Sequence, residues 1–314
     1  GSDREQLTSL ARTCSGIGDA IPTVLTMTVV PILGAGSSMA DYRIGFKLWA
    51  LIIAVVFVIS ELVCVACVPE RPVACDEKPG KISDMFKALF KNDQAMTVVV
   101  SIILVYTSLN ICGNLVLYFF RFDVGNEGAY SIFAAVAFAA QVLVMMVIPL
   151  LRKRFSKSQL FISGFIIQIA GFAVILIMAF AKLYTPQSWY ILCLPGILIY
   201  LGYGMLNVIM TIFLSDSVDY GEVMNGTREE SVIFSMQTFT VKLASGVAVF
   251  LAGLVVDWIH LDTAAAVQTQ DTLDALRMWM TIPSVILLIV GIFVFKRFYK
   301  LDDTRMEEIK SKLN

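Results

Sequence analysis

Long apolar runs constrain this chain more than any other feature of its sequence. A helix crosses a bilayer with about 20 apolar residues, and eight runs of about that length are present. They predict eight transmembrane helices, at residues 14–33, 44–68, 95–120, 130–151, 159–181, 188–214, 232–259 and 278–298. Only 16% of the 314 residues are charged and the mean hydropathy is +0.78, whereas a soluble chain carries about 25% charged residues. We expect an all-α polytopic membrane protein.

The positions of lysine and arginine predict the topology. Basic residues precede the first run, separate the second run from the third and the fourth from the fifth, and follow the last run. With eight spans these four sites lie on one face, which the positive-inside rule assigns to the cytoplasm. We expect a multi-pass protein of the cell inner membrane with both ends cytoplasmic. The net charge of −1 gives no reason to expect nucleic acid as a partner. The partners we expect are membrane lipid and a small-molecule substrate.

A segment rich in proline and charge, residues 69–94, breaks the apolar pattern. Within it, residues 81–93 place apolar side chains on one helical face, which indicates an amphipathic helix on the inner membrane surface or packed only on protein. We expect residues 1–68 to form two helices of an N-terminal half and residues 69–94 a cytoplasmic middle loop. Residues 95–300 would then form a six-helix C-terminal half, and residues 301–314 a cytoplasmic tail.

Charged residues inside apolar runs locate a candidate pathway, because in lipid they must face protein or water. Asp19 lies within the first run, with Arg12 about two helical turns before it. Lys242 lies near the middle of the seventh run and shares a face with Thr238. A lysine so far from an interface would be strained if it snorkelled. We expect these side chains to face a polar site.

Tyrosine and asparagine form stripes on two further runs. Tyr106, Asn110 and Asn114 share a face of the third run, and Tyr203 and Asn207 share a face of the sixth. Aromatic rings beside amides are suited to a sugar, which stacks an apolar face and hydrogen-bonds at its edges. Hydrogen bonding between membrane helices would explain the same stripes.

Signatures of enzymes and metal sites are missing from the sequence. It contains no GxxxxGK phosphate loop and no HExxH motif. Cys64 and Cys67 lie in an apolar run without a nearby histidine, which favours helix packing. His260 has no catalytic partner in view. We expect no enzyme, no cofactor and no metal site.

The residues around the sixth and seventh runs resemble a known family. DSVDYGE at residues 216–222, NGTREES at 225–231, QTFTVK at 237–242 and REQL at 4–7 are similar to the glycoside–pentoside–hexuronide:cation symporters. That family, typified by the melibiose permease, belongs to the major facilitator superfamily. The resemblance implies helices five to twelve of a twelve-helix fold, and symport of a sugar, glycoside or uronide with Na⁺ or H⁺ by alternating access.

The resemblance also implies roles for individual residues. Arg12 matches an arginine of the sugar site, Lys242 a lysine between the sugar and cation sites, and Thr238 a position near the cation. A cytoplasmic gate of ion pairs is implied for Arg4, Glu5, Asp216, Asp219 and Arg228. Asn207 stands where the melibiose permease has tryptophan, so melibiose itself is not implied. Asp19 matches no position of the family and remains a candidate from its own chemistry.

A rival hypothesis belongs to another class. The chain would be a truncated, non-transporting membrane interaction module, or one piece of a split transporter. In either case its partner would be a missing N-terminal part of the transporter.

Overall fold

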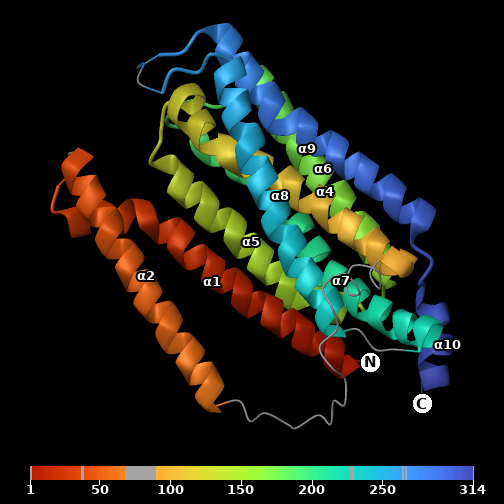
Figure 1. The fold of residues 1–314 in the computed structure, drawn as a ribbon. Coiled ribbons are helices and arrows are strands. Elements are labelled where there is room, and N and C mark those ends of the chain that lie inside the picture. The colour runs from red at the N-terminus through yellow and green to blue at the C-terminus, as the bar shows by residue number, and fades with distance from the viewer. Residues whose placement is uncertain are drawn as a thin grey trace.

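The computed structural model describes residues 2–36, 39–67, 90–226, 230–263, 265 and 267–313 (Figure 1). These residues form helices and connections, without a strand among them. In chain order the elements are α1 (Ser2–Gly34), α2 (Met39–Cys67), α4 (Asp93–Tyr118), the π-helix η1 (Phe119–Val124), α5 (Ala129–Leu151), α6 (Lys157–Phe180), the 3₁₀-helix η2 (Trp189–Leu192), α7 (Cys193–Asn225), α8 (Glu230–Trp258), α9 (Gln270–Phe298) and α10 (Asp303–Leu313).

Each predicted apolar run falls on a helix. Seven of the described helices are long and apolar enough to cross a membrane, from Asp41–Cys67 through Gln270–Phe298. The protein is therefore an all-α, multi-pass membrane protein. Helix α1, several of whose side chains lie outside the described part of the structure, is not among these seven spans. A membrane crossing by α1 stays a prediction.

Helix α7 is the centre of the molecule. In the span that contains α7, 78% of the most apolar segment is buried inside the protein. The corresponding share is 61% for the span that contains α4 and η1, and less than half for every other span found. It packs against α4, α5 and α6, and α9 in turn packs against α4 and α6. The helix also continues past the predicted end at residue 214 to Asn225, where the left-handed Gly226 ends it. This extension carries the acidic residues of the 216–222 block as helical side chains.

Glycines allow α6 and α7 to approach closely. A Cβ atom on Gly202 of α7 would lie 2.6 Å from the carbonyl oxygen of Gly164 and 2.7 Å from the backbone nitrogen of Gln168, both on α6. Small residues at such positions let helix backbones pack tightly in membranes. The α6–α7 contact therefore depends on the missing side chain at Gly202.

Helices α1 and α2 form a hairpin at one edge of the molecule (Figure 1). The buried Gly45 of α2 faces the carbonyl of Val30 on α1 closely, and Trp49 Nε1 donates a hydrogen bond of 2.8 Å to Thr26 Oγ1. Helix α1 packs onto α5 and α7, whereas none of the apolar window of α2 is buried. The hairpin is thus attached to the bundle through α1.

The predicted middle loop lies mostly outside the described residues. Of the predicted amphipathic helix at 81–93, the described residues 90–93 include a short helical stretch at Phe90 and Lys91, followed by the N-cap Asn92 of α4. The division of the chain at residues 69–94 stays a prediction. The predicted tail is helical over α10, which packs against the end of α7. Its apolar contact consists of Leu301, Met306 and Ile309 against Tyr220, Val223 and Tyr299.

A buried ion-pair cluster joins η1, α9 and the connection between α6 and α7. Arg277 donates to Asp123 from Nε at 2.8 Å and from Nη2 at 2.5 Å, and both side chains are 3% exposed. Asp274 accepts from the third nitrogen, Nη1, at 2.7 Å, and the Tyr184 hydroxyl donates to Asp123 at 2.6 Å. Burial raises the pKa of Tyr184, and the charge of Asp123 raises it further. The phenol therefore stays a proton donor, and the four side chains of this cluster are paired with one another.

Candidate functional site

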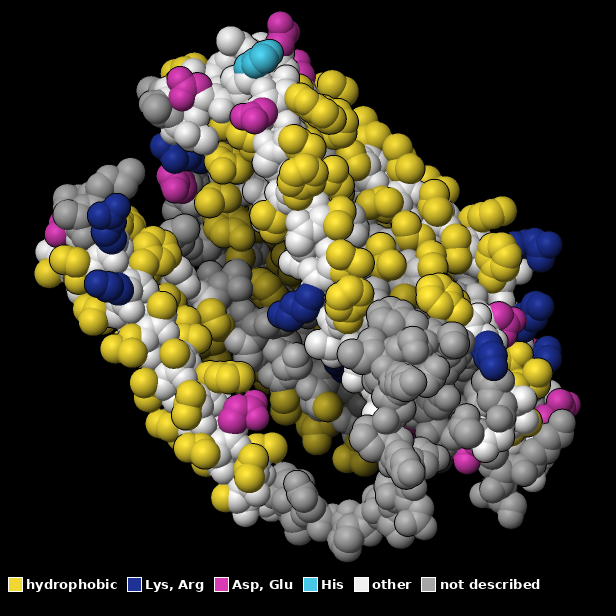
Figure 2. Space-filling model, viewed as in Figure 1, with side chains coloured by type: hydrophobic (Ala, Val, Ile, Leu, Met, Phe, Trp, Pro, Cys, Tyr) yellow, Lys and Arg dark blue, Asp and Glu magenta, His cyan; other side chains and the backbone are white. Residues whose placement is uncertain are grey.

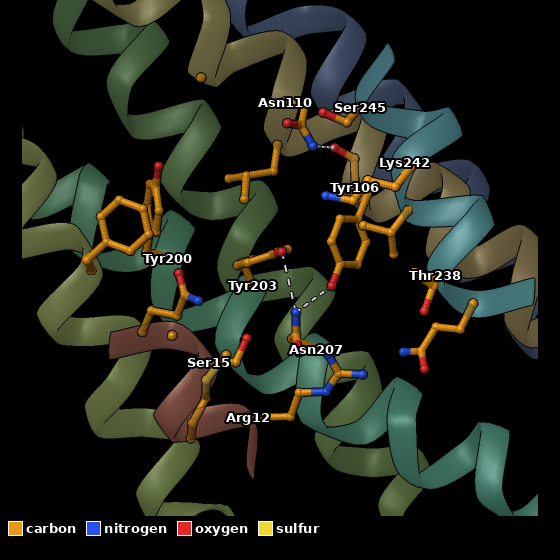
Figure 3. A pocket seen from close by; sticks show the side chains of 18 of the residues that line it. Arg12, Ser15, Tyr106, Asn110, Tyr200, Tyr203, Asn207, Thr238, Lys242 and Ser245 are labelled. Carbon is orange, nitrogen blue, oxygen red and sulfur yellow. Dashed lines mark hydrogen bonds between the residues drawn. The ribbon is translucent and has the colours of Figure 1, made fainter. Parts of the chain in front are cut away.

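A cavity of about 730 Å³ lies between α1, α4, α5, α7 and α8 (Figure 3). Its volume is typical of a site for a small molecule. Figure 2 shows the molecule hollowed on this face, between the α1–α2 hairpin and α8. The described lining residues are Arg12, Ser15 and Gly16 of α1; Tyr106, Leu109, Asn110, Gly113 and Asn114 of α4; Phe138, Gln141 and Met145 of α5; Tyr200, Tyr203 and Asn207 of α7; and Gln237, Thr238, Val241, Lys242 and Ser245 of α8.

The structure brings most of the predicted site residues together here. Side chains from four helices that are distant in sequence meet around one space because α1 and α4 each pack against α7, and α8 packs against α4. The predicted residues that line the cavity are Arg12, Tyr106, Asn110, Asn114, Tyr203, Asn207, Thr238 and Lys242. Asp19 belongs to α1, and its side chain lies outside the described part of the structure.

Two tyrosines and an asparagine form a hydrogen-bonded cluster on the cavity wall. Asn207 Nδ2 donates to the hydroxyl of Tyr106 at 2.7 Å and to that of Tyr203 at 3.4 Å (Figure 3). The two rings meet edge to face, with centroids 5.5 Å apart. Asn207 is 7% exposed and Tyr203 is 8% exposed. The amide fixes both phenols, so the rings are held in place before any ligand binds.

The asparagines of α4 use their amino groups within their own helix. Asn110 Nδ2 donates to the Tyr106 carbonyl, and Asn114 Nδ2 donates to the Asn110 carbonyl, both at 2.7 Å. Each Nδ2 atom keeps a second N–H, and each amide also presents its carbonyl oxygen as an acceptor. This wall of the cavity is suited to accept hydrogen bonds from hydroxyl groups.

Arg12 connects α1 to α7 at one end of the cavity. Its Nε donates to Thr211 Oγ1 at 3.0 Å, and Thr211 Oγ1 donates in turn to the Asn207 carbonyl at 3.0 Å. Gln237 Nε2 also donates to Thr211, at 3.4 Å. The terminal guanidinium nitrogens of Arg12 have no hydrogen-bond partner among the described residues. They are available to a ligand.

Lys242 supplies a second positive charge. It lines the cavity one helical turn after Thr238, whose hydroxyl bonds to the Phe234 carbonyl at 3.3 Å. Neither Lys242 nor Arg12 forms an ion pair with a described residue, and the described lining contains no aspartate or glutamate. The described wall of the cavity is therefore positively charged.

The predicted gate residues are only partly described. Asp216 and Asp219 are buried on α7, at 4% and 5% exposed. Lys157 Nζ lies 2.5 Å from Asp216 and 3.5 Å from Asp303 of α10. Arg152 also pairs with Asp303, at 3.4 Å. In the described structure Asp216 thus joins the start of α6 and the tail helix to α7.

The remaining gate residues lie on segments whose side chains are not placed. Arg4 and Glu5 belong to α1, but their side chains lie outside the described part of the structure, as does all of Arg228.

Ser15 and Gln141 are among the polar lining residues that sequence reasoning missed. Ser15 lies on α1 next to Gly16, and Gln141 lies on α5. Gln141 is the one amide in its apolar run. Because a polar residue inside a membrane span is unfavourable unless it has a role, this position could have identified Gln141 as a candidate. Its Oε1 atom is buried and has no hydrogen-bond partner among the described residues.

The described residues contain no group of three His, Cys, Asp or Glu side chains that could hold a metal ion. Cys64 and Cys67 are exposed free cysteines on α2 and do not line the cavity. The cavity itself combines aromatic rings, amide oxygens and two cations. This combination is suited to bind a hydroxylated solute reversibly.

Comparison with known proteins identifies relatives along almost the whole chain. The family model described as "MFS/sugar transport protein" matches residues 1–303. The chain is 24% identical to the raffinose carrier protein of Pediococcus pentosaceus over 99% of its length and 48% of the relative. It is 24% identical to the isoprimeverose transporter of Lactiplantibacillus pentosus over 96% of its length and 61% of the relative.

A lactose permease of Lactobacillus delbrueckii subsp. bulgaricus is similar to the same extent. It is 24% identical over 99% of the chain and 49% of its own length. The chain thus spans between about half and about three fifths of the length of these relatives. All three names are those of transporters.

Proposed function

The chain belongs to the MFS/sugar transport protein family, and from that membership we propose that it acts in secondary transport of a sugar, glycoside or uronide. Transport is coupled to Na⁺ or H⁺ and proceeds by alternating access. The observation that carries this proposal is the cavity, because eight residues that the sequence analysis predicts to bind sugar or cation line this one space. The names of the relatives, which include raffinose, isoprimeverose and lactose carriers, support a sugar as the solute.

The side chains divide into roles by their chemistry. The rings of Tyr106 and Tyr203 give the sugar an apolar face to pack on. The amide oxygens of Asn110 and Asn114 accept hydrogen bonds from its hydroxyl groups. Asn207 holds both phenols in position through its two hydrogen bonds.

Charged groups couple the sugar to the cation. Arg12 and Asp19 act at the sugar, and Lys242 with Thr238 acts between the sugar and the cation. A bound cation and a bound sugar each change the free energy of the other's binding, and this coupling is reciprocal. Movement of the halves with only one solute bound leaves charge unpaired in the membrane, which is unfavourable.

The topology proposed for this activity places the basic clusters in the cytoplasm. The protein would lie in the cell inner membrane with both ends of the chain cytoplasmic. Residues 1–68 would contribute two helices to one half and residues 95–300 would form the other, with residues 69–94 as the middle loop. Arg4, Glu5, Asp216, Asp219 and Arg228 would form a cytoplasmic gate, whose ion pairs open and close with the cavity.

Uptake into membrane vesicles tests this function. Vesicles that contain the protein should accumulate a labelled sugar from a panel of glycosides and uronides when an inward Na⁺ or H⁺ gradient is imposed. Lys242→Leu and Asp19→Ala should each abolish the gradient-dependent part. Lys296→Leu changes an exposed lysine outside the cavity and serves as the control. Unchanged uptake in both site variants would contradict the site assignment.

A second candidate is a non-transporting membrane interaction module or one piece of a split transporter. The observation that favours it is α2, because none of its membrane-length apolar window is buried in the described structure. This candidate predicts no uptake and stable co-purification with another membrane chain from the native membrane. Gradient-driven uptake by the purified chain alone would exclude it.

A further inference from the structure

We propose that Thr211 is a positioning residue of the cavity, which holds Arg12 and Gln237 in place before the solute binds. The inference rests on the proposed function and adds a residue to the same site. Thr211 lies on α7, four residues after Asn207, and is 8% exposed. It does not belong to the described lining. Arg12 and Asn207 are drawn close together in Figure 3, and the Thr211 hydroxyl links them.

The Thr211 hydroxyl uses all of its hydrogen-bonding capacity on three protein partners. A hydroxyl can donate one hydrogen bond and accept two. Oγ1 of Thr211 donates to the Asn207 carbonyl at 3.0 Å. It accepts from Arg12 Nε at 3.0 Å and from Gln237 Nε2 at 3.4 Å. No capacity is left for a solute, so the hydroxyl can act on the site only through the side chains that it holds.

These hydrogen bonds join three helices. Arg12 enters from α1 and Gln237 from α8, and both meet the hydroxyl on α7. Helix α7 packs extensively against α5 and α6, but much less extensively against α1 and α8. Hydrogen bonds between polar side chains are a usual way of joining helices in a membrane. Thr211 therefore fixes two walls of the cavity, those of α1 and α8, relative to α7.

The side chains that Thr211 holds are long and would otherwise be ordered by the solute. Ordering of a flexible side chain during binding lowers the affinity. Because Nε of Arg12 is already engaged, the orientation of its guanidinium group is fixed, and its two terminal nitrogens have no partner among the described residues. Gln237 lines the cavity and is held in the same way. The structure thus assigns to Thr211 a contribution to affinity without contact with the solute.

Calorimetric titration of the purified full chain in lipid nanodiscs tests this role. The probe is whichever of raffinose, lactose, isoprimeverose and glucuronate binds the wild-type protein most tightly in the presence of NaCl. Thr211→Val keeps the shape of the side chain and removes the hydroxyl. It should weaken binding about tenfold, since two long side chains must then be ordered by the solute. Thr211→Ser keeps the hydroxyl and should restore binding.

A second buried threonine provides the matched control. Thr281 on α9 is 0% exposed, lies outside the described lining, and donates to the Arg277 carbonyl of its own helix at 2.7 Å. Thr281→Val should leave the affinity for the probe unchanged. Unfolding temperature identifies any variant that has lost its fold, and Thr211→Ala is the second variant without the hydroxyl.

A double variant shows whether Thr211 acts through Arg12. Arg12→Lys keeps the positive charge but removes Nε, so Thr211→Val should weaken binding less in that background than in the wild-type protein. An equal effect in the two backgrounds, unchanged binding by folded Thr211→Val, or equal losses in Thr211→Val and Thr211→Ser would each overturn the positioning role and leave the proposed function standing. Failure of the wild-type protein to bind any of the four probes would overturn both.

Discussion

At the scale of single residues, two buried glutamines carry amide atoms without a described partner, one inside the cavity lining and one outside it. Gln141 lines the cavity with a buried Oε1 that has no described partner. Gln168 is 0% exposed on α6, and neither polar atom of its side chain has a described partner. An unpaired buried polar group costs about 1–3 kcal/mol of stability. The chain therefore retains two unfavourable amides, and of these two only Gln141 lines the cavity.

We predict that Gln141→Leu and Gln168→Leu both raise the free energy of unfolding, by about 1 kcal/mol each, since each removes an unpaired amide of similar volume. Gln141→Leu should also weaken sugar binding, and Gln168→Leu should not. Thermal unfolding and calorimetric titration of the two variants measure both effects. A Gln168→Leu variant that loses sugar binding, or a Gln141→Leu variant that keeps it, would contradict the assignment of Gln141 to the site.

Single residues of the site were predictable where polarity and spacing coincide. Tyr106, Asn110 and Asn114 recur every four residues in an apolar run, so their shared face followed from helix geometry. Gln141 was missed because it stands without a polar neighbour at helical spacing, whereas Ser15 was missed although Arg12 precedes it by three residues and Asp19 follows it by four. The pairing of Arg277 with Asp123 also could not be predicted, because the two residues are 154 positions apart.

At the scale of the elements, the ion pair of Lys157 and Asp216 joins the start of α6 to α7, and Asp303 extends it to α10. The side chains of Lys157 and Asp216 are 6% and 5% exposed, whereas that of Asp303 is 37% exposed. Removal of one partner of a buried ion pair lowers the stability of the protein more than removal of a partner from a solvent-exposed pair, because the remaining buried charge is left unpaired.

We expect Asp216→Asn to lower the free energy of unfolding by about 3–5 kcal/mol, as is typical when one partner of a buried pair is removed. Asp303→Asn should lower it by about 1 kcal/mol or less. The double variant Lys157→Met with Asp216→Leu should recover most of the loss, because no charge is then buried alone. Denaturation in one detergent compares the three. Equal effects of Asp216→Asn and Asp303→Asn would contradict this account of the cluster.

The α6–α7 contact gives a second prediction about elements. Gly202→Ala should destabilise the protein and separate α6 from α7, because its Cβ would lie 2.6 Å from the Gly164 carbonyl oxygen. Gly253→Ala on α8 is the matched control, since nothing lies within 4 Å of its added Cβ. An alanine there should be neutral or stabilising by up to about 1 kcal/mol, the helix preference of alanine over glycine. A Gly202→Ala protein that unfolds at the wild-type temperature would refute the close contact.

At the scale of the whole molecule, apolar runs predicted where the helices lie because a backbone in lipid must satisfy its own hydrogen bonds. The family resemblance seen around Asp219 and Lys242 is confirmed by the match over residues 1–303. Hydropathy alone could not predict that α7 extends to Asn225 or that α10 docks onto it, because both features depend on packing outside the apolar runs. The arrangement of α1, α4, α7 and α8 around one cavity likewise depends on contacts distant in sequence.

The central claim is that this cavity binds a sugar and a coupling cation together. The most direct measurement is the dissociation constant of the preferred sugar for the purified chain, with Na⁺ present, with Na⁺ replaced by choline, and across a range of pH. Linkage predicts that either Na⁺ or protons tighten sugar binding by about 5- to 150-fold, and that Lys242→Leu abolishes this gain. Sugar affinity that responds neither to Na⁺ nor to pH would contradict the claim.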